Sequence, residues 1–311
     1  MNESSNAIKE GVLFLGIYFL LILSTLFIPF VGLLTVFLLP IPFILFGKKY
    51  GLKPSLYLLL VSFVLLLILA YPLAIIFTIT FASTGVVIGE LYRREKPAFA
   101  VLLGGSLTVI TALIVNFIGS IVLLDIHPIR AVQDVLTDSV EQTESMLAVF
   151  GDQQATFEAA QELIDQLIVI TPSLFILIGV AFAFIVQWLA SITARMLKSE
   201  VSTFPPLREW SFPKAFIWYY LIMYIFILIG VDEGTTMYTI VYNLFPILEM
   251  VMVIQGLALI FFFFHKKKIH IAVPISILFL SVLFPFMLYL VRILGIIDLG
   301  FELRKRLDSN K

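Results

Sequence analysis

The sequence predicts an all-α, polytopic integral membrane protein with about nine or ten membrane segments and an amphipathic helical pair on the outer face. Three observations predict this class. The 311-residue chain is 61% hydrophobic and only 13% charged, whereas soluble domains are nearer half apolar and a quarter charged. Its apolar residues form long runs of the length that a spanning helix needs. Short basic clusters separate several of these runs, and such clusters stay in the cytoplasm during insertion.

The first five predicted segments occupy the N-terminal part of the chain, at residues 11–28, 31–46, 55–70, 73–91 and 98–124. The second contains Pro40 and Pro42, and each proline removes a backbone hydrogen bond, so we expect a kinked or partly re-entrant helix. A compact basic cluster of Arg93, Arg94 and Lys96 follows the fourth segment and predicts a cytoplasmic turn. Counting back from that turn places the N-terminus in the cytoplasm.

Small residues mark two of these segments as closely packed. Gly85 and Gly89 are four residues apart, so they lie on one helix face and permit the close approach of another backbone. Gly104 and Gly105 form a second set in the following helix. We interpret both sets as helix-packing faces. The alternative is an interface with a partner protein, because tight crossings of either kind use the same residues.

Residues 125–165 differ from the rest of the chain. They contain Arg130 as their only lysine or arginine, against nine carboxylates. Apolar residues recur along this stretch at helical spacing, and Gly151-Asp152 is a natural break. We therefore expect two amphipathic helices within residues 126–165, lying outside the membrane on the outer face.

The C-terminal part contains four further apolar runs, at residues 168–197, 215–231, 237–264 and 269–297. Residues 198–214 connect the first two runs, and we expect them to form a cytoplasmic loop. The last run is either one span or two short helices bent at Pro285. The basic tail Arg304-Lys305-Arg306 favours the bent hairpin, because a hairpin returns the tail to the cytoplasm.

The composition excludes several classes of function. The chain has no cysteine, which removes disulfides, thiolate nucleophiles and cysteine metal sites. It contains no phosphate-binding glycine loop, nucleophile elbow or zinc-ligand spacing, and no basic domain for nucleic acid. We therefore expect no enzymatic activity, no cofactor and no metal. The N-terminus lacks the basic region and cleavage site of a secretory signal, so the first run is interpreted as a membrane helix.

Three polar side chains inside apolar runs are candidate ligand contacts: Asn116, Asn243 and Glu249. A carboxylate at membrane depth is costly, so Glu249 is expected to face the bundle interior or a cavity. Its functional interpretation is a ligand, ion or proton site, and the structural alternative is a protonated or hydrogen-bonded contact between helices. Asn243 and Gln255 would extend it into one polar stripe, but for these amides we favour ordinary interhelical hydrogen bonding.

Two motifs and a glycine pair carry a resemblance to a known family. They are LPIPFILFGKKYG at residues 39–51, GVVIGELYRREKP at residues 85–97 and the Gly-Gly helix that follows. With these features, residues 7–197 resemble the substrate-binding (S) components of energy-coupling-factor vitamin transporters. The resemblance implies a six-helix bundle in which Asn116 lies among the helix ends around a ligand. It also implies a coupling subunit and ATPases supplied by other chains.

The complete chain resembles the YybS-like family of membrane proteins from low-GC Gram-positive bacteria, which brings no known activity. Its ending, GIIDLGFELRKR at residues 295–306, is similar to that family's ending. We accordingly divide the chain into the S-component-like bundle at 7–197, the loop at 198–214, and additional membrane helices with a basic tail at 215–311.

Two function hypotheses follow for this protein of the bacterial plasma membrane. The first is a small-molecule binding or transport subunit that resembles S components and works with partner chains. The second is a structural or regulatory membrane protein that acts through envelope proteins and has no transported substrate. The acidic residues 125–165 and the loop at 198–214 are the features that the second hypothesis uses.

Overall fold

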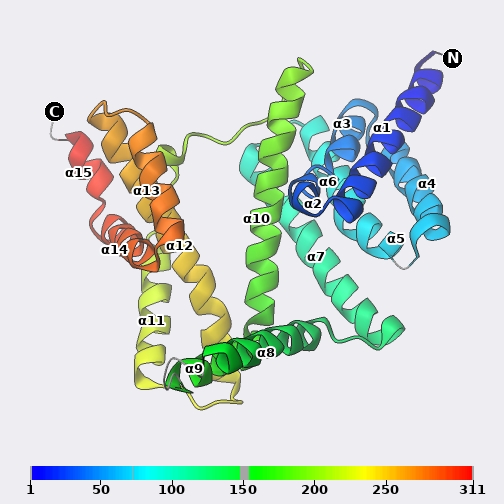
Figure 1. Ribbon diagram of the computed structural model, residues 1–311. Helices are drawn as coiled ribbons and strands as arrows, with labels where there is room; N and C mark the ends of the chain where they lie inside the picture. Colours follow the sequence, from blue (N-terminus) through cyan, green and yellow to red (C-terminus); the bar gives the residue numbers. More distant parts are fainter. Residues whose placement is uncertain (1, 72, 148–153, 310–311) are drawn as a thin grey trace. The chain divides into compact units, whose positions relative to one another are not determined.

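A computed structural model describes residues 2–71, 73–147 and 154–309, and this part of the chain is helical, with no β-strand (Figure 1). The helices form two compact units. Unit 1 comprises residues 1–165 and 174–204, and unit 2 comprises residues 166–173 and 205–311. Among the described residues, six helices are long and apolar enough to cross a membrane, and a bent pair makes a seventh if it is one span. The predicted polytopic all-α class is therefore confirmed.

The described residues of unit 1 form ten α-helices, the last shared with unit 2, and one π-helix. They are α1 (Asn2–Phe27), α2 (Pro29–Thr35), α3 (Ile41–Tyr50), α4 (Leu52–Ala70), α5 (Leu73–Ile76), the π-helix η1 (Phe77–Ala82), α6 (Ser83–Arg93), α7 (Ala98–Leu124), α8 (Pro128–Leu147), α9 (Gln154–Asp165) and α10 (Leu167–Met196). The predicted second segment is divided into α2 and α3. Pro40 and Pro42 lie at the start of α3, where a proline costs no helical hydrogen bond.

The core of unit 1 forms where α3 crosses α6. A Cβ atom at Gly85 would overlap the carbonyl oxygen of Pro40, and one at Gly89 would lie 2.7 Å from the carbonyl oxygen of Ile44. These glycines therefore let the two backbones approach closely. Gly104 and Gly105 lie on α7, which packs on α6. A Cβ atom at Gly105 would lie 3.0 Å from a side-chain carbon of Ile88. This second pair of glycines therefore packs against side chains of α6 and not against its backbone.

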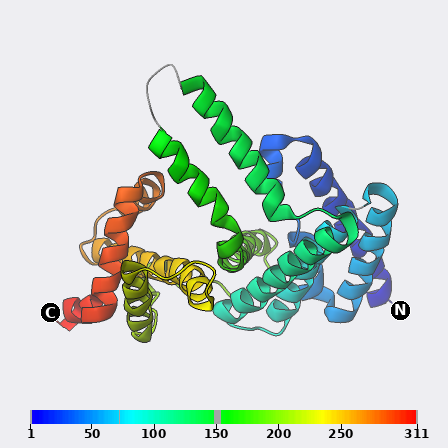
Figure 2. The ribbon, with the colours of Figure 1, turned by 90° about the horizontal axis from the view of Figure 1, so that it is seen from below.

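The acidic stretch forms two helices, α8 and α9, that run side by side (Figure 2). The side-chain amide of Gln133 in α8 donates to the carbonyl oxygen of Ile164 in α9 at 2.8 Å, and Ile164 is buried. Neither helix is a candidate membrane span. The two predicted amphipathic helices are therefore present, and the predicted break at Gly151-Asp152 lies outside the described residues.

Unit 2 is built around the long helix α12, with shorter helices packed on it. Its elements after the first turns of α10 are η3 (Leu207–Glu209), α11 (Ala215–Ile229), α12 (Thr236–Lys266), α13 (Ala272–Leu283), α14 (Pro285–Phe301) and α15 (Leu303–Ser309). α13 and α14 are bent by 119°, with extended backbone at Phe284. Because the residue before a proline disfavours the helical conformation, Pro285 accounts for this break, and the predicted bend at Pro285 is confirmed.

The crossing of α12 and α14 is the tightest in unit 2. A Cβ atom at Gly256 would overlap the carbonyl oxygen of Val291, and a Cβ atom at Gly295 would overlap that of Met252. Both obstacles are backbone atoms, which cannot move aside as a side chain can. The two glycines therefore set the distance between α12 and α14.

Candidate functional site

The π-helix η1 interrupts the membrane segment at residues 73–93 and widens its backbone. Local hydroxyls bond to the helix here: Thr84 donates to the carbonyl oxygen of Thr80 at 2.5 Å, and Ser83 donates to that of Ile79. The buried hydroxyl of Tyr18 in α1 donates to the carbonyl oxygen of Phe77 at 3.0 Å, which supplies a donor at the start of η1. Single π-turns within helices are frequent at functional sites.

Asn116 of α7 contacts η1 directly. Its side-chain nitrogen donates to the hydroxyl oxygen of Thr80 at 2.8 Å, and Thr80 is only 7% exposed. The other polar atom of the amide, Oδ1, is buried and has no hydrogen-bond partner among the described residues. A buried polar group without a protein partner is unusual in native proteins and marks a candidate ligand contact. If the amide were turned over, its nitrogen would be left without a partner instead.

A hollow of about 380 Å³ lies between the η1–α6 segment and α7. Its lining is mainly apolar, with three hydroxyl-bearing side chains: Ile79, Ser83, Leu107, Thr108, Thr111 and Ala112. Asn116 lies one helical turn beyond Ala112, and the 100° step of an α-helix puts both residues on one face of α7. The unpartnered Asn116 amide is therefore next to this hollow.

The chemistry of this hollow suits a small, largely uncharged molecule. Ser83 and Thr108 use their hydroxyl protons on carbonyl oxygens of their own helices, so their oxygens remain available only as acceptors. Asn116 Oδ1 adds a third acceptor one turn away. None of the residues lining the hollow carries a charge. A ligand here would present hydrogen-bond donors on an otherwise apolar surface.

The side chain of Asn243 in α12 bonds to backbone groups of α10 at an irregular turn of that helix. Its side-chain nitrogen donates to the carbonyl oxygen of Val169 at 2.7 Å, and its Oδ1 accepts from the backbone N–H of Ser173 at 2.9 Å. In an uninterrupted α-helix these two backbone groups would bond to each other. Pro172 lies inside α10 between them and disfavours that regular geometry. The Asn243 amide is thus inserted into the hydrogen-bond ladder of α10.

Glu249 pairs with Arg292 of α14. Both side chains are largely shielded, at 31% and 20% exposure, and the guanidinium of Arg292 also lies over the ring of Tyr289. The ion pair connects α12 to α14 within unit 2. Asp298, six residues after Arg292 in the sequence, pairs instead with Arg304 at 2.8 Å.

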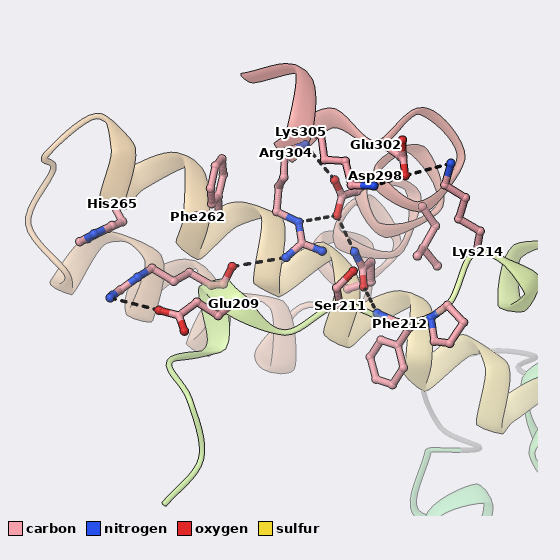
Figure 3. Close-up of a pocket in the computed structure, with 14 residues that line it drawn as sticks. Glu209, Ser211, Phe212, Lys214, Phe262, His265, Asp298, Glu302, Arg304 and Lys305 are labelled. Carbon is pink, nitrogen blue, oxygen red and sulfur yellow. Dashed lines mark hydrogen bonds and ion pairs between the residues drawn. The ribbon is translucent and has the colours of Figure 1, made fainter. Parts of the chain in front are cut away.

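A buried polar network joins the loop before α11 to α12 and α14 (Figure 3). Gln255 Oε1 accepts from the backbone N–H of Phe212, and its nitrogen donates to Asp298 at 2.5 Å. Arg304 bonds to the same carboxylate and to the carbonyl oxygen of Trp210 at 2.6 Å. Gln255 and Asp298 are 1% and 3% exposed. The bonds to Phe212 and Trp210 fix the loop on the helices, and the bonds to Asp298 join the helices to one another.

This network forms part of the lining of a pocket of about 590 Å³. All three carboxylates lining the pocket are paired with basic residues: Asp298 with Arg304, Glu209 with Arg208, and Glu302 with Lys214 and Lys305. Figure 3 shows Lys214 reaching across to Glu302. Because every one of these carboxylates already has a basic partner in the protein, the pocket is better explained as the junction of a loop with helices than as a ligand site.

The three candidate ligand contacts occupy different places. Asn116 lies in unit 1, and Asn243 and Glu249 lie in unit 2. Although Asn243 and Glu249 share α12, they are six residues apart and contact α10 and α14 respectively. Gln255 contacts the loop before α11 and, through Asp298, also α14. The polar residues of α12 therefore bond to different side chains and backbone groups of the protein, which agrees with the favoured interpretation of interhelical hydrogen bonding.

The sequence reasoning missed Thr80, Tyr18 and the glycines Gly256 and Gly295. A run of hydroxyl residues in an apolar helix, TITFAST at residues 78–84, is the signal for η1, because such side chains compete for backbone carbonyls. No group of three or more histidine, aspartate or glutamate side chains that could hold a metal occurs in the described residues.

Comparison with known proteins assigns this arrangement to a family. The model of the family described as "Predicted membrane protein (DUF2232)" matches residues 16–299. The chain belongs to the DUF2232 family. It is also similar to a protein of Bacillus subtilis (strain 168) named "Uncharacterized protein YybS", with 27% identity over 308 residues, which cover 98% of this chain and 99% of that relative. No solved structure matches it.

The DUF2232 match includes residues of both units, from α1 to α14. The hollow beside Asn116 and the α12–α14 crossing therefore both lie inside the region that defines the family. The resemblance to YybS-like proteins is confirmed over nearly the full length of the chain.

Proposed function

We propose that this DUF2232 protein is a small-molecule binding or transport subunit, similar in role to the S components of energy-coupling-factor transporters. Unit 1 would hold the ligand in the hollow beside η1. The observation that carries the proposal is the Asn116 amide, whose nitrogen donates to Thr80 and whose buried oxygen has no hydrogen-bond partner among the described residues. A ligand that donates a hydrogen bond would remove the cost of this unpaired group.

Asn116 is the only one of the three candidate contacts that keeps this role in the proposal. Asn243 and Glu249 are each occupied by protein partners, so their polar groups support helix packing in unit 2. Gly85, Gly89, Gly104 and Gly105 pack α6 against α3 and α7, which fixes the segment that carries Ser83 relative to α7.

The proposed setting is the bacterial plasma membrane, with the basic turns in the cytoplasm. The described chain contains no nucleotide-binding loop, so a transport cycle would take its energy from ATPases and a coupling subunit on other chains. The protein itself would not be an enzyme. The acidic helices α8 and α9 would lie on the outer face, above the membrane.

The first test is recovery of the tagged protein from its native membranes in mild detergent, followed by native mass spectrometry. The proposal predicts a small molecule at one copy per chain, or co-purification of a coupling subunit with ATPases. Recovery of envelope proteins with an empty bundle would contradict it and would favour the structural or regulatory alternative, in which α8 and α9 are the contact surface. Deletion of residues 134–162 would then abolish partner recovery while the bundle still inserts.

A further inference from the structure

A second, chemically different hollow lies in unit 1 at the C-terminal end of α10. Two adjoining cavities of about 510 and 260 Å³ share Ser191, Arg195 and Thr203 in their lining. The remaining walls come from α10 and from residues 198–204, which follow it. This hollow is separate from the one beside η1, since the two have no lining residue in common.

The loop that closes this hollow is firmly attached to the rest of unit 1. Lys48 of α3 donates to the hydroxyl of Ser199 at 2.6 Å and to the carbonyl oxygen of Glu200. At the other end of the loop, the ring of Phe204 packs on Phe184 and Phe99, with centroids 5.0 and 5.5 Å apart. Both ends of the loop are therefore anchored, and the hollow is part of the folded structure of unit 1.

The polar lining of the hollow is rich in cations and hydroxyls. Arg195 and Lys198 bring two positive charges, and neither makes an ion pair in the part of the chain that the structure describes. Glu200 brings one negative charge. Four hydroxyls complete the set: Ser191, Ser199, Ser202 and Thr203. Guanidinium, ammonium and hydroxyl donors are the groups that bind phosphate oxygens in proteins.

Two buried polar atoms in this hollow have no partner. Gln187 is 1% exposed, and its nitrogen donates to the carbonyl oxygen of Ala98 at 2.9 Å. Its Oε1 atom and the hydroxyl oxygen of Ser202 have no hydrogen-bond partner among the described residues. Both residues line the smaller cavity together with Arg195. The site thus offers an unused acceptor and an unused hydroxyl beside a cation.

One wall of the smaller cavity is apolar and outward-facing. Trp188 and Ile192 line it and are 54% and 39% exposed, on a helix that is long and apolar enough to span a membrane. Tryptophan is enriched where a membrane helix meets the headgroup region. A hollow with cations at its polar end and exposed apolar side chains at its other wall suits a molecule with an anionic head and an apolar body.

We propose that the hollow lined by Gln187, Arg195, Lys198 and Ser202 binds the phosphate group of an anionic ligand, as presented by a phosphatidylglycerol headgroup. Arg195, Lys198 and the Ser202 hydroxyl donate to the phosphate oxygens. Gln187 Oε1 accepts from a hydroxyl of the headgroup glycerol. A soluble phosphate would use the same cations, and the experiment below separates the two sources.

The test uses the full-length protein in a neutral detergent, with the unfolding temperature as the readout of binding. Three additions are titrated: phosphatidylglycerol, phosphatidylcholine, and inorganic phosphate against sodium chloride of equal ionic strength. The variant is Arg195→Gln with Lys198→Gln. The matched control is Lys53→Gln with Lys96→Gln, which removes two exposed charges from the same unit outside this hollow.

We expect phosphatidylglycerol to raise the unfolding temperature saturably, with an apparent affinity that falls about tenfold or more in the Arg195/Lys198 variant and is unchanged in the control. Phosphatidylcholine should have a smaller effect. If inorganic phosphate alone produces the saturable, Arg195-dependent shift, the site binds a soluble phosphate. An absent shift with every addition, or an equal loss in the control, would overturn the proposal.

Ser202→Ala distinguishes a binding site from a packing defect. Removing a buried hydroxyl that has no partner should leave the ligand-free unfolding temperature unchanged or raised. The shift produced by the bound ligand should nevertheless become smaller in this variant. A Ser202→Ala protein with an undiminished ligand-induced shift would remove Ser202 from the site.

Discussion

At the scale of single residues, Asn243 replaces a hydrogen bond that α10 lacks. Its amide bonds to the carbonyl oxygen of Val169 and to the N–H of Ser173, which face each other across the turn that contains Pro172. Leaving both backbone groups unpaired in a buried setting costs more than either hydrogen bond contributes. The asparagine and the proline should therefore be energetically coupled.

Asn243→Leu should lower the free energy of unfolding by about 1–3 kcal/mol, because it leaves two backbone groups of α10 without a hydrogen-bond partner. In a Pro172→Ala background the same change should cost less, since a regular helix can reform the bond between residues 169 and 173. The measurement is a double-mutant cycle by reversible unfolding in mixed micelles. Additive effects would show that Asn243 does not act on the break in α10.

The Glu249–Arg292 ion pair can be tested by a second double-mutant cycle. Glu249→Leu or Arg292→Leu alone leaves one shielded charge without its partner and should destabilise the protein by about 1–3 kcal/mol, less than for a fully buried pair because both groups are partly exposed. The double variant should be more stable than either single variant. If Glu249→Leu is harmless and instead abolishes retention of a small molecule, Glu249 is a ligand contact.

Glu302 gives unit 2 a dependence on pH. Hydrogen bonds from Lys305 and Lys214 lower the pKa of its carboxyl group from 4.5 to about 2. Because the folded pKa lies below the unfolded one, this stabilisation is present above about pH 4.5 and is lost as the pH falls toward 2. Stability measured between pH 5 and pH 2 should fall less steeply in Glu302→Gln than in the unsubstituted protein. Parallel profiles would contradict this assignment.

At the scale of helices, the crossing of α12 and α14 is set by two glycines. Gly256→Ala or Gly295→Ala should destabilise the protein by about 2–3 kcal/mol or more, because the added methyl group meets a backbone carbonyl. Gly119→Ala in α7 is the matched control: a Cβ atom there meets nothing within 4 Å, and the change should be neutral or stabilising by up to about 1 kcal/mol. Equal effects at both positions would contradict a close crossing.

Local signals predicted the helices better than their pairing. Gly85 and Gly89, four residues apart, indicated a packing face, and Pro285 indicated the bend between α13 and α14. By contrast, Gly256 and Gly295 are single glycines 39 residues apart, so nothing local links them. The ion pair of Glu249 with Arg292 and the bond of Asn116 to Thr80 could not be predicted for the same reason: each depends on how distant helices are placed.

At the scale of the whole molecule, the absence of cysteine makes topology directly measurable. In intact cells, the single-cysteine variants Lys96→Cys and Lys267→Cys should be protected from a membrane-impermeant maleimide. The variant Ser139→Cys, in α8, should react with it. All three should react after the membrane is opened, which controls for local reactivity. Labelling of Lys96→Cys in intact cells would reverse the proposed orientation.

The central claim of this account is that the hollow beside η1 holds a small molecule whose donor is bound by Asn116. The most direct measurement compares three proteins purified from native membranes by native mass spectrometry: unsubstituted, Asn116→Leu, and Val115→Leu on the exposed side of α7. We predict one small molecule per chain in the unsubstituted and Val115→Leu proteins and loss of that molecule in folded Asn116→Leu. Equal retention by all three, or an empty unsubstituted protein, would contradict the claim.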